Sequence, residues 1–90
     1  MKKALVSVTG VDKPGIIAKV STALYELNVN VLEISQTILD GKFTMVMAVD
    51  AANANVGFEE LAAQLRELGE GMELSIRIQR EEIFDAMHRI

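Results

Sequence analysis

Two hydrophobic patterns succeed each other along this 90-residue chain. Four segments alternate apolar and polar side chains, which is typical of half-buried β-strands. These segments are residues 4–9, 31–38, 42–49 and 72–79. In the second of them, the apolar face carries Leu32, Ile34 and Ile38. Residues 16–27 and 56–68 instead repeat apolar side chains every three or four positions, which indicates amphipathic helices. The tail, residues 81–90, has the same helical spacing and predicts a short C-terminal helix.

Turn-forming residues separate these segments. Residues 10–15 combine two glycines with the single proline, and they therefore separate the first strand from the first helix. Asp12, within this loop, is of a residue type that caps helix N-termini well. Asp40 and Gly41 form a hairpin signal between the second and third strands. Gly69 follows the second helical repeat, where we expect it to be the C-terminal cap.

The resulting order of elements predicts a ferredoxin-like βαββαβ plait of the α+β class. This is a four-stranded antiparallel sheet with two helices on one face, here with a short C-terminal helix added. We divide the chain into one domain, residues 1–80, and a helical tail, residues 81–90. The second sheet face is left bare and carries apolar as well as polar side chains. Leu5, Val46 and Ala48 on this face indicate that something covers part of it, and a second copy of the chain is the simplest candidate.

The composition excludes several classes of site and partner. Because there is no cysteine, disulfides, thiolate metal sites and a cysteine nucleophile are excluded, and His88 alone cannot form a histidine-rich metal centre. Nine basic against thirteen acidic residues give a net charge of −4, which argues against nucleic-acid binding. The longest apolar run, residues 45–49, is far shorter than the roughly 20 residues of a membrane-spanning helix. We expect a soluble cytoplasmic protein that holds no metal or cofactor and has no membrane partner.

The loop after the first strand carries a motif. The strand is followed by Gly-x-Asp-x-Pro-Gly at residues 10–15, an apolar pair, an amphipathic helix and Asn-Val-Asn at residues 28–30. This pattern resembles the opening of an ACT domain, a small regulatory module that senses amino acids or related metabolites. The order of elements matches that family over residues 3–80. The chain is similar in particular to free-standing single ACT domains and to the ACT repeats of glycine-cleavage repressors.

The resemblance implies a regulatory module, not an enzyme, that binds a small molecule, acts as a homodimer and signals through a separate protein target. In similar proteins, an amino acid lies between the first loop of one chain and the first helix or second strand of its neighbour. By position, the loop contact falls on Asp12 and the partner asparagine on Asn30. The candidate ligand-binding residues are Val11, Asp12, Pro14, Gly15, Ile16, Ile17 and Asn30.

The chemistry of the loop is compatible with this role. Pro14 and Gly15 begin a helix whose first N–H groups lack internal partners, so a ligand carboxylate could be held there. Asp12 could accept hydrogen bonds from an ammonium group, and the Asn30 amide could donate or accept. Each residue also has a plainer interpretation: Asp12 as a helix cap, Asn30 as a turn residue, and Pro14 with Gly15 as a backbone-shaping pair.

Three other functions are carried by plaits of this kind. Acylphosphatase-type hydrolysis needs a cationic phosphate cradle in the first loop, which here has Lys13 but no arginine. RNA recognition needs aromatic side chains on the central strands, but residues 4–9 have none and Phe43 falls on the predicted core face. A pure assembly domain without a ligand stays open, because fold does not fix function. The tail, residues 81–90, is the candidate segment for contact with a protein target.

Overall fold

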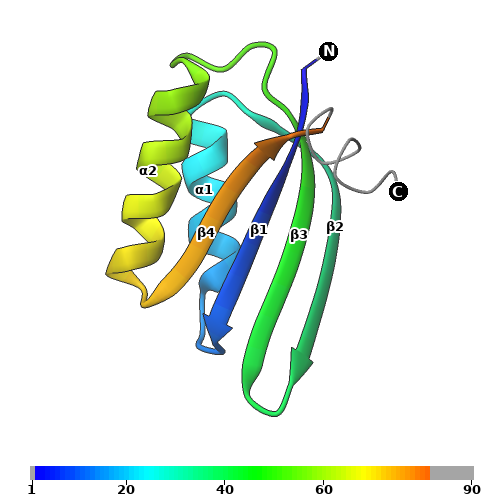
Figure 1. Ribbon diagram of the computed structural model, residues 1–90, viewed down its shortest axis with the longest axis vertical. Coiled ribbons are helices and arrows are strands. Elements are labelled where there is room, and N and C mark those ends of the chain that lie inside the picture. Colours follow the sequence, from blue (N-terminus) through cyan, green and yellow to red (C-terminus); the bar gives the residue numbers. More distant parts are fainter. Residues whose placement is uncertain (1, 82–90) are drawn as a thin grey trace, which may run out of the picture.

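The computed structural model describes residues 2–81, which form a four-stranded sheet with two helices on one face (Figure 1). The elements are β1 (Lys3–Val11), α1 (Ile16–Glu26), β2 (Asn30–Leu39), β3 (Lys42–Asp50), α2 (Phe58–Gly71) and β4 (Leu74–Arg80). This architecture confirms the predicted ferredoxin-like plait. The predicted C-terminal helix lies, apart from Glu81, outside the described residues, and the division into a domain and a helical tail stays a prediction.

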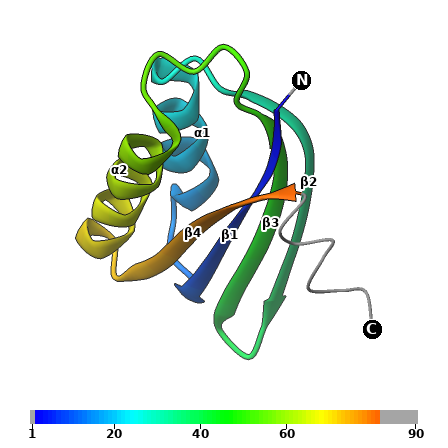
Figure 2. The same cartoon turned by 45° about the horizontal axis from the view of Figure 1, so that its top comes forward.

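The strands follow the order β2-β3-β1-β4 and all neighbouring pairs are antiparallel. β1 is central, with Val6 opposite both Met47 of β3 and Ile78 of β4. Because β1 and β2 each run antiparallel to β3, they point the same way. The loop that leaves β1 therefore lies at the same end of the sheet as the end of β2, and the start of β2 lies at the opposite end (Figure 2).

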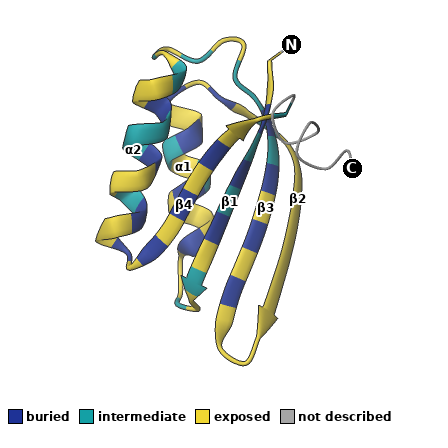
Figure 3. Ribbon diagram, in the orientation of Figure 1, coloured by how far each residue is buried: buried dark blue, intermediate teal, exposed yellow. Residues whose placement is uncertain are grey.

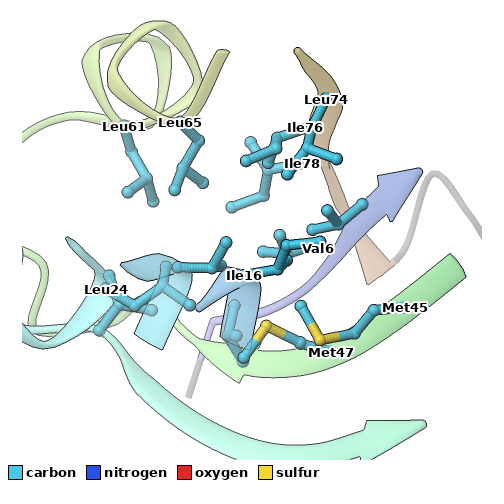
Figure 4. Packing of buried hydrophobic residues seen from close by; sticks show 14 of the residues in the cluster. Val6, Ile16, Leu24, Met45, Met47, Leu61, Leu65, Leu74, Ile76 and Ile78 are labelled. Atoms are coloured by element: carbon cyan, nitrogen blue, oxygen red, sulfur yellow. The ribbon is translucent and has the colours of Figure 1, made fainter. Parts of the chain in front are cut away.

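The core lies between the sheet and the two helices. Three strands bury alternate residues, as the sequence pattern predicts, and these buried positions form bands along β1, β3 and β4 in Figure 3. Figure 4 shows Leu61 and Leu65 of α2 directed toward Ile76 and Ile78, while Met47 of β3 lies on the α1 side of the cluster. The fully covered side chains include Val6, Val8, Val20, Leu24, Met45, Met47, Val49 and Leu61.

The expectation that β2 is half-buried is wrong. Ile34 lies opposite Met47 and Ile38 opposite Phe43, so both are on the helix side of the sheet. Ile34 is nevertheless 47% exposed and Ile38 54% exposed. The reason is that β2 is an edge strand over which neither helix extends far enough, and Figure 3 shows it exposed along most of its length. A bulge between Val31 and Glu33 interrupts the pairing at the start of the strand.

The second helix and fourth strand differ from the predicted boundaries. The sequence predicts that Gly69 caps the C-terminal end of α2. Gly69 is instead buried inside the helix, which continues to Gly71. A Cβ at Gly69 would lie 2.7 Å from the carbonyl oxygen of Leu74, so the missing side chain lets α2 approach β4 closely. β4 begins at Leu74 rather than two residues earlier, because Glu73 takes a left-handed φ of 58°. At the other end, α2 begins at Phe58.

The second sheet face is bare of helices within residues 2–81, as the sequence predicts (Figures 1 and 2). Val46 in its centre is 39% exposed, whereas Leu5 and Ala48 beside it are half-buried by their neighbours. Val11 and Leu39 are more exposed, at 66% and 74%.

Candidate functional site

The β1–α1 loop is fixed by backbone hydrogen bonds. The Asp12 N–H donates to the Gly41 carbonyl at 2.9 Å, which ties the loop to the β2–β3 turn. Gly15 has a φ of 84° and occupies the N-cap position of α1, where no side chain makes a capping hydrogen bond. The alternative interpretation of Asp12 as the helix cap is therefore wrong, because the cap lies three residues further along and its left-handed backbone favours glycine. The Asp12 side chain is exposed.

Lys13 fixes the same loop from the other side. Its half-buried side chain crosses to the C-terminal end of α2, where Nζ donates a hydrogen bond to the Met72 carbonyl. The contact joins residues that lie 59 positions apart in the chain. The sequence offers no signal for it, since the pairing depends on where α2 ends.

A cleft of about 330 Å³ opens between this loop, the first turn of α1 and the sheet. Four of the predicted residues line it, together with residues that sequence reasoning missed. The lining consists of Asp12, Lys13, Gly15, Ile16, Ile17, Ala18, Gln36, Ile38 and Phe43. Its walls are apolar at Ile17, Ile38 and Phe43, and its rim carries one carboxylate and one amine. The last three lining residues come from β2 and β3, and only the sheet topology brings them to this end of the molecule.

Three predicted residues lie outside this lining. Val11 ends β1 and Pro14 belongs to the loop, and neither residue lines the cleft. Asn30 begins β2 and pairs with Asp50, at the opposite end of the sheet from Asp12. Within one chain, Asp12 and Asn30 therefore cannot contact the same small ligand.

A second and larger cleft, of about 860 Å³, lies at that opposite end. It is bordered by the start of β1, the β3–α2 loop, the first residues of α2 and the end of β4. None of the predicted ligand-binding residues lines it.

Two other properties bear on function. Within residues 2–81, no group of three or more histidine, cysteine, aspartate or glutamate side chains is placed to hold a metal ion. No helix in that part of the chain has the length and apolar character needed to cross a membrane.

The comparisons with known proteins agree with the fold. The family model of the ACT domain matches residues 2–79. A UPF0237 protein of Bifidobacterium longum is 54% identical over 90 residues, covering 100% of both chains. Among solved structures, an ACT domain protein from Streptococcus pneumoniae has a TM-score of 0.82 and 38% identity, over 92% of this chain and 93% of that one.

More distant structures share the fold alone. A candidate transcriptional repressor of the glycine cleavage system matches with a TM-score of 0.77 at 20% identity, over 88% of this chain and 45% of that one. ACT domains are regulatory modules that bind small molecules. Because the family model, the relative from Bifidobacterium longum and the structure from Streptococcus pneumoniae each match nearly the whole chain, this chain belongs to the ACT domain family.

Proposed function

We propose that this protein is a cytoplasmic regulatory module that binds an amino acid or a related metabolite as a homodimer and signals through a separate protein. The observation that carries the proposal is the cleft of about 330 Å³ at the start of α1. Its fixed backbone and apolar walls suit a small ligand.

The cleft offers groups for both ends of an amino acid. The first helical hydrogen bond runs from the Lys19 N–H to the Gly15 carbonyl at 3.0 Å. The N–H groups of residues 16–18 precede it and are available for a ligand carboxylate, which the helix dipole also favours. The exposed Asp12 carboxylate can accept hydrogen bonds from the ligand ammonium group. Ile17, Ile38 and Phe43 would surround the ligand side chain.

A second copy of the chain would complete the cleft. β2 is a ten-residue edge strand whose outer backbone groups have no strand partner among residues 2–81. If two copies pair antiparallel along the whole strand, Asn30 of the second copy lies beside Leu39. Asn30 of the second copy would then lie at the end of the sheet that holds the cleft, which it cannot reach within its own chain. The pairing would also cover part of the exposed surface of Ile34 and Ile38.

Ligand binding is tested by calorimetric titration of the full-length protein with the twenty common amino acids. We expect at least one to bind, and we expect Asp12→Ala and Asn30→Ala each to weaken it. Asn53→Ala is the matched control, because Asn53 is an exposed asparagine outside the lining of this cleft. Absence of binding across the panel rejects the amino-acid proposal.

The dimer is tested by sedimentation of two matched variants. Ile38→Glu places a charge at the β2 edge, whereas Val46→Glu places the same charge in the centre of the bare face. Edge pairing predicts that Ile38→Glu dissociates the dimer and that Val46→Glu leaves it intact. The reverse result would assign the dimer to packing of the bare faces, and a monomeric parent protein would reject both arrangements.

Two alternatives remain distinguishable. A pure assembly domain would dimerise in the second experiment and bind nothing in the first. An acylphosphatase-type hydrolase is disfavoured by Lys13, because its amine, the one cation of the loop, donates to the Met72 carbonyl rather than facing a phosphate site.

A further inference from the structure

The larger cleft, of about 860 Å³, is a separate site at the far end of the sheet from the β1–α1 loop. Figures 1 and 2 show the start of β1, the end of β4 and the β3–α2 loop meeting there. Its volume falls within the range of roughly 300–1,000 Å³ that is usual for small-molecule sites. Much of the space exists because four of the lining side chains are alanines.

Hydrogen bonds hold the walls in place. The Ala51 N–H donates to the Lys2 carbonyl at 2.8 Å, and the Ala54 N–H donates to the Ala51 carbonyl at 3.2 Å. The Asp50 carboxylate accepts from the N–H groups of Lys2 and Ala52, which lowers the pKa of Asp50. The N-terminal residues and the β3–α2 loop are thereby fixed to each other, so the cleft is formed without a ligand.

The rim of the cleft is cationic in a protein of net charge −4. Lys2, Lys3 and Arg80 line it, against one carboxylate, that of Glu81. Lys3 alternates with the buried Ala4, so its ammonium lies on the other sheet face and the charge at the rim comes from Lys2 and Arg80. The Arg80 guanidinium lies 4.3 Å from the centroid of the Phe58 ring, a cation–π contact that fixes its position. None of the side-chain hydrogen bonds found within residues 2–81 uses the guanidinium of Arg80 or the amines of the two lysines.

The floor of the cleft is apolar. Leu61 is fully buried beneath it, and Val56 and Phe58 are half-buried against the core. Arg80 pairs in register with the buried residue Ala4, so its side chain lies on the helix side of the sheet, above this floor. A cationic group is therefore held directly beside an apolar surface.

We infer that this cleft binds a small organic anion, with its carboxylate or phosphate group on Arg80 and Lys2 and its apolar body on Val56, Phe58 and Leu61. Stacked on the ring, the planar guanidinium keeps its N–H edge available for a two-oxygen acceptor. The Lys2 ammonium adds charge without fixing geometry. This site is independent of the amino-acid cleft proposed above, because the two share no lining residue.

The test is an NMR titration of the ¹⁵N-labelled full-length protein with four probes. Hexanoate and hexyl phosphate carry both an anionic group and an apolar body, hexanamide has the body without the charge, and inorganic phosphate has the charge without the body. We expect saturable amide shifts at Ala52, Gly57 and Phe58 with the first two probes. The shifts at Gly15 and Ile17 in the other cleft should stay small. Hexanamide and inorganic phosphate should bind at least about tenfold more weakly, since each lacks one of the two interactions.

Paired variants assign the binding to the arginine. Arg80→Gln should weaken hexanoate about tenfold, the loss expected for a charge-assisted hydrogen bond. Arg77→Gln is the matched control, because Arg77 lies on the same strand and is exposed on the opposite face. The inference is overturned if hexanamide binds as tightly as hexanoate, if Arg80→Gln and Arg77→Gln bind alike, or if no probe saturates. Comparing the binding affinities of hexanoate and hexyl phosphate identifies which anionic group the cleft prefers.

Discussion

Gly69 allows the packing of α2 on β4 to be tested with a single methyl group. In Gly69→Ala, the added Cβ would lie 2.7 Å from the Leu74 carbonyl oxygen and 2.9 Å from Cγ1 of Ile76. The first distance is 0.7 Å below the 3.4 Å at which ordinary contact begins, and the group it meets is backbone. The helix or the strand must therefore move, since the obstacle cannot rotate away.

The expected magnitude follows from two opposing effects. Overpacking of this kind costs about 1–3 kcal/mol, while replacing a helical glycine by alanine gains about 0.5–1 kcal/mol. Gly71 supplies the control, because it is the last residue of the same helix and a Cβ there meets nothing within 4 Å. Gly71→Ala should thus be neutral or slightly stabilising. We expect the free energy of unfolding of Gly71→Ala to be higher than that of Gly69→Ala by about 1–3 kcal/mol.

Urea unfolding followed by far-ultraviolet circular dichroism measures this difference. The two variants and the parent protein are compared at one protein concentration, because association would otherwise contribute to the apparent stability. In thermal unfolding, each 1 kcal/mol should appear as a shift of about 4–8 °C. The reasoning is refuted if Gly69→Ala is as stable as Gly71→Ala, since the close approach of α2 to β4 would then not exist in solution.

Two further predictions concern the core and the response to acid. Met47→Ala should lower the free energy of unfolding by about 2–5 kcal/mol, because Met47 is fully buried, while Val46→Ala on the exposed face should stay within about 0.5 kcal/mol in the same urea assay. The pKa of Asp50 is lowered by the N–H groups of Ala52 and Lys2, so its stabilisation is complete above the unfolded-state pKa near about 4 and is lost as pH falls through the lower folded value. The stability difference between the parent and Asp50→Ala should therefore shrink on acidification from pH 7 to pH 2, and a difference independent of pH would contradict this.

The sequence predicts the sheet well where a helix covers the strand. Alternation in β1, β3 and β4 identifies the buried residues because these strands lie beneath the helices. The same alternation in β2 identifies which face Ile34 and Ile38 occupy, but it does not reveal whether a helix covers them. Coverage depends on strand order, and hydrophobic periodicity carries no information about that order.

Gly69 and Asp12 depart from their plain local interpretations as helix caps for a common physical reason. Glycine near the end of a helical repeat usually adopts the left-handed cap, and aspartate before a helix usually accepts its first N–H groups. Gly69 lies inside α2 because β4 approaches the helix closely there and leaves no room for a side chain. At the start of α1, Gly15 occupies the N-cap position that Asp12 would need. Both outcomes depend on tertiary structure, which a local pattern cannot represent.

The candidate site was only partly predictable for a related reason. The loop motif locates Asp12, Gly15, Ile16 and Ile17, which are close in sequence and line one cleft. Gln36 and the other walls come from strands that fold back on this end. The second cleft is lined by residues from both ends and the middle of the described chain, so no local sequence motif could predict it.

If the protein forms the proposed dimer through β2, the unpaired edge of this strand also determines how a monomeric variant should be engineered. Ten residues of exposed strand that carry a single charged side chain, Glu33, can template further strands when no partner shields them. Trimming Ile38 to alanine would weaken a dimer yet leave this edge open to aggregation. A charged replacement at the same position would act as a gatekeeper that both disfavours pairing and keeps the separated chains in solution.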